Sequence, residues 1–241
     1  MFKKIPRARL YELVAEEVEK AILDGHYEIG SRLPSEQNLA DQFEVSRNVV
    51  REALKVLQER GLVQVLDGSG AYVAQPNSGA TASALGRYIR LIGANSAIDA
   101  LYETRIALEG FNARLAAQRA TPEQIGELEA LIEHMRESIG LSSEEWTGAD
   151  LEFHLAMARA TNNPFQSLLL KPLVEQLREV IAQGFDNLAA AQTGLAAHEK
   201  LLECIKTHDP EGAYNTIIAH LIHSERTVKE KLIENKLGNA V

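Results

Sequence analysis

The sequence has few of the features that mark secreted or membrane-bound proteins. It contains one cysteine, Cys204, so no intrachain disulfide can form, and a reducing cellular compartment fits this composition. No segment approaches the ~20 consecutive apolar residues that a membrane-spanning helix needs. The basic N-terminal stretch MFKKIPRARLYELV lacks the apolar run of a signal peptide. We therefore expect a cytoplasmic protein that does not bind a membrane.

Positive charge is also scarce. The chain has 25 Lys and Arg against 34 Asp and Glu, a net charge of −9, and its first 75 residues hold 10 basic against 12 acidic side chains. This balance excludes a broad basic surface, so any binding to DNA must depend on individually placed contacts, doubled in a dimer. The local exception is residues 46–60, which contain Arg47, Arg51, Lys55 and Arg60 against Glu52 and Glu59.

Residues 31–61, SRLPSEQNLADQFEVSRNVVREALKVLQERG, have the pattern of two short helices joined by a tight turn. Pro34 fits only the start of a helix, and Ser35 fits the position that caps its free amides. The first helix breaks around Glu44, and Ser46 is the predicted cap of the second. The spacing therefore predicts a helix-turn-helix.

The second of these helices is amphipathic. Its apolar stripe consists of Val49, Val50, Ala53, Leu54 and Leu57. Arg47, Asn48 and Arg51 fall on the opposite face. Such a helix can enter a DNA major groove, where Arg suits guanine and Asn suits adenine, while Ser46 and the free amides can hold a phosphate. An ordinary helical hairpin with solvated arginines is the alternative on these residues alone.

A hairpin follows directly. Residues 62–66 and 71–74 are rich in β-forming side chains, and the turn between them, residues 67–70, reads DGSG. A helix-turn-helix followed by a hairpin is a winged helix. Gly68 and Gly70 allow the backbone of the wing to approach a phosphate or a groove wall closely.

The stretch PSEQNLADQFEVSRNVVREALKVLQERGLVQVLDGSGAYV resembles the DNA-binding domain of GntR-type bacterial transcription regulators, over roughly residues 9–75. The resemblance implies base or phosphate contacts from Arg47, Asn48 and Arg51, with Gly68 at the wing tip. With Ser35 and Ser46 at the two helix starts, the predicted DNA-contact residues are Ser35, Ser46, Arg47, Asn48, Arg51 and Gly68. Two positions depart from the usual pattern. Gln37 stands where many members carry an arginine, and Leu66-Asp67 replaces a commonly basic pair. Asp67 should repel phosphate.

The 241 residues, 45% of them hydrophobic, suffice for two domains. We predict a winged helix-turn-helix domain at 1–75, whose first helix spans 9–24, a polar linker at 76–83 and a helical domain at 84–241. Helical periodicity and caps predict seven helices in the second part, at about 81–92, 96–119, 122–139, 144–161, 164–184, 188–207 and 210–236. The expected fold is mostly α: three helices with a β-hairpin, then an all-α bundle.

Histidines and one carboxylate form a second pattern. Asp150 and His154 are four residues apart, so both project from one face of one helix. His198 and His220 lie on later predicted helices among apolar neighbours. One carboxylate and three imidazoles suit a divalent transition metal such as zinc. Hydrogen-bonded core histidines are the alternative, and His223, one turn from His220, is a rival ligand.

Three further stretches, RIALEGFNARLAAQRATPEQI, DLEFHLAMARATNNP and HEKLLECIKTHDPEGAYNTIIAHL, resemble the all-helical FCD effector domain of the FadR-type branch of the GntR family, over residues 80–236. The resemblance implies a divalent metal, zinc first and nickel, manganese or iron as alternatives, held by Asp150, His154, His198 and His220. It also places Arg105 in the effector cavity, where a guanidinium can bind a carboxylate through two hydrogen bonds. An internal salt bridge with Glu109 is the alternative role of this arginine.

The leading functional hypothesis is a ligand-responsive transcription regulator, expected to be a repressor. It would bind a palindromic operator as a homodimer and respond to a small organic acid, a hydroxy or sugar acid, at the metal and Arg105. A metal-dependent enzyme such as a hydrolase with a DNA-binding appendage is the alternative, although no separate general base or phosphate loop is apparent. A purely structural metal is the third interpretation.

Overall fold

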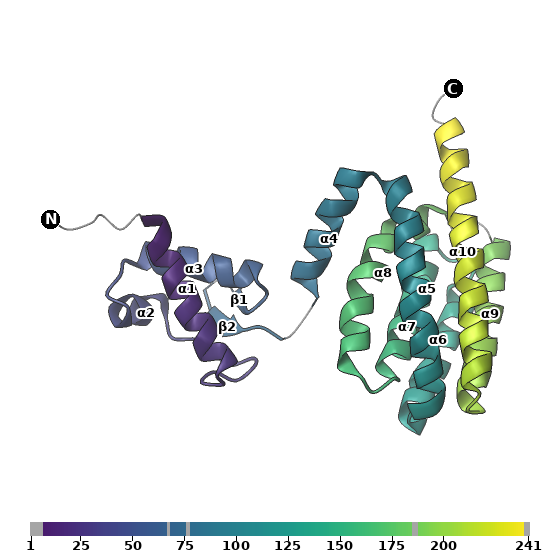
Figure 1. Cartoon of the computed structure of the whole chain (residues 1–241), viewed down its shortest axis with the longest axis horizontal. Helices are drawn as coiled ribbons and strands as arrows, with labels where there is room; N and C mark the ends of the chain where they lie inside the picture. The colour runs from purple at the N-terminus through teal and green to yellow at the C-terminus, as the bar shows by residue number, and fades with distance from the viewer. Residues whose placement is uncertain (1–6, 67, 76–77, 185–187, 239–241) are drawn as a thin grey trace. The chain divides into compact units, whose positions relative to one another are not determined.

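The computed structural model describes residues 7–66, 68–75, 78–184 and 188–238 (Figure 1). The chain divides into two compact units, residues 1–80 and 81–241. None of the described helices is both long and apolar enough to cross a membrane.

The first unit is a winged helix-turn-helix, as predicted. It contains α1 (Arg7–Leu23), α2 (Glu36–Gln42), α3 (Arg47–Glu59), β1 (Val63–Leu66) and β2 (Gly70–Val73). The two strands form an antiparallel hairpin whose register runs from the pair Val63 and Val73 to the pair Leu66 and Gly70. The apolar stripe of α3 packs against α1, α2 and the hairpin, and its fully buried members are Val50, Ala53, Leu54 and Leu57.

The helix boundaries of this unit follow from their caps. Ser35 Oγ accepts the Asn38 amide hydrogen at the start of α2, and Ser46 Oγ accepts that of Val49 at the start of α3. Between the two helices Glu44 has a φ of 52°, which produces the sharp turn that ends α2. Both predicted caps are therefore confirmed.

The structure adds an extended segment that the sequence did not indicate. Residues 30–33 pair with the free edge of β2: the amide of Leu33 donates to the Ala71 carbonyl, and that of Val73 to the Ser31 carbonyl, both at 2.9 Å. Sequence reasoning treated these residues only as a lead into the helix-turn-helix. Four residues are too few to show the two-residue alternation that marks a strand in a sequence. Only the hydrogen bonds with β2 identify the segment as extended.

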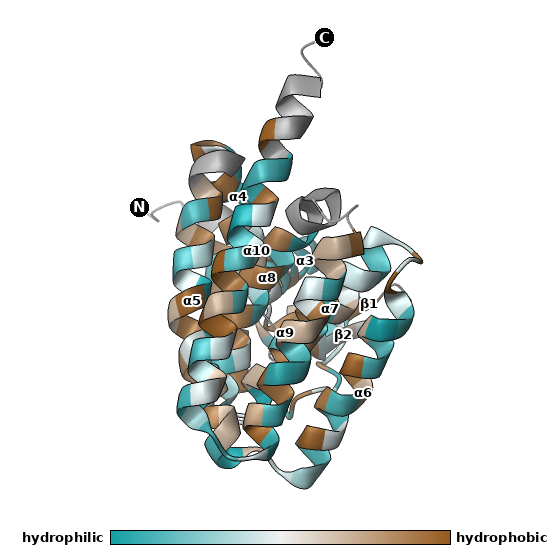
Figure 2. Ribbon diagram, turned by 90° about the vertical axis from the view of Figure 1, so that its right-hand side faces the viewer, coloured by the Kyte–Doolittle hydropathy of each residue, from teal (hydrophilic) through white to brown (hydrophobic). Residues whose placement is uncertain are grey.

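The second unit is a bundle of seven helices among its described residues, and the first of them begins two residues before residue 81. The helices are α4 (Gly79–Ile92), α5 (Ala94–Arg119), α6 (Pro122–Ser138), α7 (Ser143–Arg159), α8 (Pro164–Gly184), α9 (Leu188–Lys206) and α10 (Pro210–Gly238). The predicted ranges agree closely with these bounds. Helix α4 begins at Gly79, inside the segment predicted as a linker, because the alanines there favour helix. Figure 2 shows hydrophilic and hydrophobic residues alternating along the helices, as amphipathic packing requires.

Helix α7 is central to this bundle. Phe153, Ala156 and Met157 belong to the apolar cluster shared with α5, α6, α9 and α10. Leu151 and Leu155, on another side of α7, belong to a second apolar cluster. Helices α5, α8 and α10 contribute to this cluster, and partly buried residues of α4 pack against it. A polar side chain on a covered face of α7 has no access to water, so the buried Asp150 and His154 must find partners inside the protein.

Candidate metal centre and DNA-contact surface

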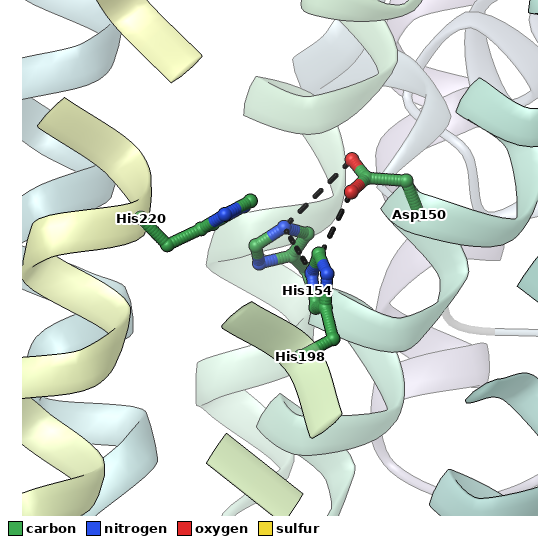
Figure 3. A group of neighbouring side chains, drawn as sticks. All are labelled: Asp150, His154, His198 and His220. Carbon is green, nitrogen blue, oxygen red and sulfur yellow. Dashed lines mark hydrogen bonds and ion pairs between the residues drawn. The ribbon is translucent and has the colours of Figure 1, made fainter. Parts of the chain in front are cut away.

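Three helices bring four possible metal ligands together. Asp150 and His154 project from α7, His198 from α9 and His220 from α10, with one potential ligand atom of each within 4.8 Å of the others (Figure 3). The side chains from α7 and α9 are buried, whereas His220 is half-buried. The structure therefore assembles the four residues that the sequence pattern singled out.

The distances are compatible with one shared metal ion. His154 Nε2 and His198 Nε2 are 3.3 Å apart. The Asp150 carboxylate lies 3.5 Å from His198 Nε2 and 3.8 Å from His154 Nε2. The His220 ring stacks on that of His154, with centroids 5.4 Å apart. Two nitrogens at zinc-binding distance from one tetrahedral ion are about 3.3–3.4 Å apart, close to the separation of the two Nε2 atoms.

Neighbouring groups fix which nitrogen of two imidazoles faces the cluster. The Gly194 carbonyl lies 2.7 Å from His198 Nδ1 and can only accept, so Nδ1 carries the proton and Nε2 a lone pair. His154 Nδ1 contacts the Glu109 carboxylate, which orients that ring in the same sense. Partners of this kind hold metal-binding histidines in the ligand tautomer.

Burial keeps two of the imidazoles uncharged. It is the largest influence on the pKa of His198 and lowers it to about 4, although Asp150 acts in the opposite direction. Burial also lowers the pKa of His220 well below its usual range, and the neighbouring His198 lowers it further. Near pH 7 both rings are therefore neutral, which is the form that binds a metal.

Arg105 forms the internal salt bridge that was the alternative to its predicted effector role. Its Nε donates to Glu109 Oε1 at 2.6 Å, and the two side chains are only 1% and 0% exposed. Burial alone would raise the pKa of Glu109, but Arg105 and His154 lower it to about 2. Glu109 is therefore an ionised bridge between the arginine and a ligand of the candidate metal centre.

Several polar atoms remain without a hydrogen-bond partner in the described interior. They include Arg105 Nη2, both amide atoms of Asn112 and the hydroxyl of Thr147. Arg105, Glu109 and Asn112 are spaced i, i+4 and i+7, so they form a polar row on one face of α5. Sequence reasoning missed Asn112, although this spacing inside an apolar helix was visible. Buried polar atoms of this kind need a polar partner such as water or a ligand.

His223, the rival ligand, faces elsewhere. It lines a groove of about 420 Å³ between α9 and α10, together with Cys204 and the exposed part of His220. Only His220 of the four clustered side chains reaches this groove. His223 is not among the described residues whose ligand atoms cluster, and Cys204 is half-buried.

The predicted DNA-contact residues lie at the start of α3, at the start of α2 and on the wing. Ser35 and Ser46 are helix caps, as described above. Asn48 is exposed on α3. Gly68 is exposed in the turn of the hairpin with a φ of 73°, a value that favours glycine, and the neighbouring Asp67 lies outside the described residues.

Glu36 holds both predicted recognition arginines. Its Oε2 accepts from Arg51 Nε at 2.8 Å and lies 3.5 Å from Arg47 Nη2, while more than half of each arginine side chain remains exposed. Sequence reasoning missed this residue. Glu36 lies 15 positions from Arg51 on another helix, so no local spacing could indicate the pairing.

Comparison with known proteins gives consistent matches along the chain. The family model described as "Bacterial regulatory proteins, gntR family" matches residues 10–73, and the FCD domain matches residues 100–223. The HTH-type transcriptional repressor NanR of Klebsiella aerogenes is 30% identical over 224 residues, covering 91% of this chain and 85% of that protein. The uncharacterized HTH-type transcriptional regulator Rv0494 of Mycobacterium tuberculosis is 30% identical, with coverages of 92% and 90%. The solved structure of Streptococcus agalactiae GntR has a TM-score of 0.72 at 25% identity, covering 90% of this chain and 99% of that one.

Proposed function

Because the chain belongs to the gntR family of bacterial regulatory proteins, which are transcription regulators and not enzymes, we propose how it regulates. In this proposal it is a repressor that binds a palindromic operator as a homodimer. A small hydroxy or sugar acid, bound beside a metal ion in the helical domain, changes the affinity for the operator.

On the DNA side, α3 enters the major groove, with one copy in each half-site. Arg47 and Arg51 at its N-terminal end supply guanidinium groups suited to guanine, and Asn48 between them suits adenine. The exposure of all three side chains supports this assignment. Ser46 and the first amides of α3 hold a backbone phosphate.

The observation that carries the metal proposal is the pair of facing nitrogens. His154 Nε2 and His198 Nε2 lie 3.3 Å apart, both turned inward by partners on Nδ1, with the Asp150 carboxylate beside them. Two lone pairs that face each other repel unless a proton or a metal ion lies between them, and the carboxylate beside them favours the metal ion. Three imidazoles and one carboxylate suit zinc, with nickel, manganese or iron as alternatives.

The effector proposal rests on charge and on unpaired donors. A bound divalent ion with five or six coordination positions would supply a positive charge, and the positions beyond its four protein ligands would be open to oxygen ligands. Together with Arg105, and against the carboxylates of Asp150 and Glu109, it leaves one excess positive charge in a buried site. A carboxylate neutralises that charge and accepts from Arg105 Nη2, which lacks a partner. Arg105 Nε already donates to Glu109, so the guanidinium cannot bind the effector carboxylate through the two parallel hydrogen bonds expected from the sequence. We propose a single hydrogen bond from Arg105 Nη2 instead.

The test combines metal analysis with ligand binding. Protein purified without chelator should contain about one metal ion per chain. A thermal-shift panel of hydroxy and sugar acids should then give at least one stabilising acid, and chelator should abolish the effect. DNA titration with that acid should change operator affinity by about 1–3 kcal/mol. A metal-free preparation would refute the metal site. A bound metal with no acid response in either assay would favour a structural metal instead.

A further inference from the structure

The wing carries no basic residue of its own. From Leu62 to Gln75 the sequence contains neither Lys nor Arg, although it is the hairpin that follows the recognition helix. Leu66, the last residue of β1, is 43% exposed. A positive charge strengthens the contact of a wing with the DNA backbone, because the phosphates supply most of the attraction. Any such charge has to come from another part of the chain.

Arg32 supplies a positive charge at this place. It lies in the extended segment beside β2 and forms a bridge with Tyr72. Leu33, the next residue, is buried in the core of the unit. Since side chains alternate across an extended segment, Arg32 projects from the outer face of the hairpin. This placement is not apparent from the sequence, in which Arg32 precedes the helix-turn-helix.

Gly70 makes room for the guanidinium. A Cβ atom at this position would lie 3.1 Å from Arg32 Nε and 3.2 Å from Nη2, closer than such atoms normally approach. Gly70 also has a φ of 114°, which favours glycine. The arginine thus lies against the backbone of Gly70 at the start of β2. Among the described residues, no carboxylate forms an ion pair with Arg32, whereas Arg47 and Arg51 share Glu36.

We propose that Arg32 is the phosphate-binding residue of the wing, seated on Gly70 and directed to a DNA backbone phosphate. The contact rests on the proposed binding of DNA through α3 and adds a second anchoring point to each half-site. It carries no sequence information, because phosphates are the same at every base pair. Its removal should therefore weaken operator and random DNA equally.

The experiment measures affinity against salt concentration for Arg32→Gln and Arg32→Lys, on operator DNA and on random DNA. Arg32→Gln should lower the slope of log affinity against log salt by about 0.9 for each bound protomer. At about 0.15 M salt this corresponds to a loss of roughly fivefold per protomer on both DNAs. Arg32→Lys should keep most of the slope, because it retains the charge. The matched control is Lys20→Gln, an exposed charge on α1, which carries no predicted DNA contact.

Three results would overturn the proposal. An unchanged slope in Arg32→Gln would mean that no phosphate contact was lost. A loss on the operator but not on random DNA would make Arg32 a base-reading residue. An equal change in Lys20→Gln would mean that only overall charge matters. The proposed recognition helix is tested separately, since Arg47→Ala and Arg51→Ala should lose sequence discrimination whether or not the wing contact exists.

Discussion

Replacing Glu109 by glutamine should weaken both the metal centre and the fold of the helical domain. The carboxylate accepts from Arg105 through Oε1 and contacts His154 Nδ1 through Oε2. Glutamine has nearly the same shape, but it offers one acceptor oxygen and turns an NH₂ group toward the other donor. One of the two partners must therefore lose its acceptor, and the buried arginine loses its counter-ion.

The expected magnitudes follow from these two losses. Arg105 is 1% exposed, and leaving a buried charge without its partner typically costs about 3–5 kcal/mol. For a domain of this size such a change lowers Tm by roughly 6–20 °C. Loss of the group that orients His154 should lower metal affinity by about 10–100-fold. The two effects come from one substitution but are measured separately.

Metal affinity is measured by competition with a chelator, and Tm by thermal unfolding with and without metal. The control is Glu127→Gln, which breaks an exposed ion pair with Arg159 and should cost at most about 1 kcal/mol, with no change in metal affinity. If Glu109→Gln binds metal like the wild type, Glu109 does not orient His154. If its Tm equals that of Glu127→Gln, the buried pair with Arg105 is not a stabilising contact.

Three further predictions concern DNA, metal and effector. Arg47→Ala or Arg51→Ala should weaken specific binding by roughly 1–3 kcal/mol in a DNA titration, with less loss on random DNA, and unchanged binding in both would exclude α3 as the recognition helix. His220→Ala should lose metal by elemental analysis whereas His223→Ala keeps it; the reverse result would reassign the ligand. Arg105→Lys keeps a charge beside Glu109 but removes Nη2, so it should abolish the thermal response to the acid and retain the metal. An acid that binds Arg105→Lys as tightly as the wild type would contradict the proposed contact.

Most of the fold could be predicted because its signals are local. Helix caps such as Ser35, Ser46 and Thr121 act within three residues of themselves, and amphipathic spacing reports which face is buried. The extended segment at 30–33 could not be predicted, since its hydrogen bonds join it to residues some 40 positions later. Pairing over that distance leaves no periodic trace in four residues.

The candidate metal centre could also be predicted only in part. Asp150 and His154 share a helix face, so their spacing alone places them together. The approach of His198 and His220 from two other helices was expected only through resemblance. The Gly194 carbonyl and Glu109, which orient two of the rings, depend on how α5, α7 and α9 pack, so histidine spacing gives no sign of them.

Glu36 links the acidic composition of the chain to its binding of DNA. In the free protein one carboxylate holds both Arg47 and Arg51, and exposed pairs of this kind are worth at most about 1 kcal/mol each. In the proposed complex with DNA, guanine can therefore displace the carboxylate at small cost, because it offers each arginine two well-placed acceptors. A phosphate must approach against the negative charge of Glu36, which disfavours contacts with random DNA. With a net charge of −9, the chain gains little from the general attraction between protein and DNA, so placed contacts must decide both affinity and specificity.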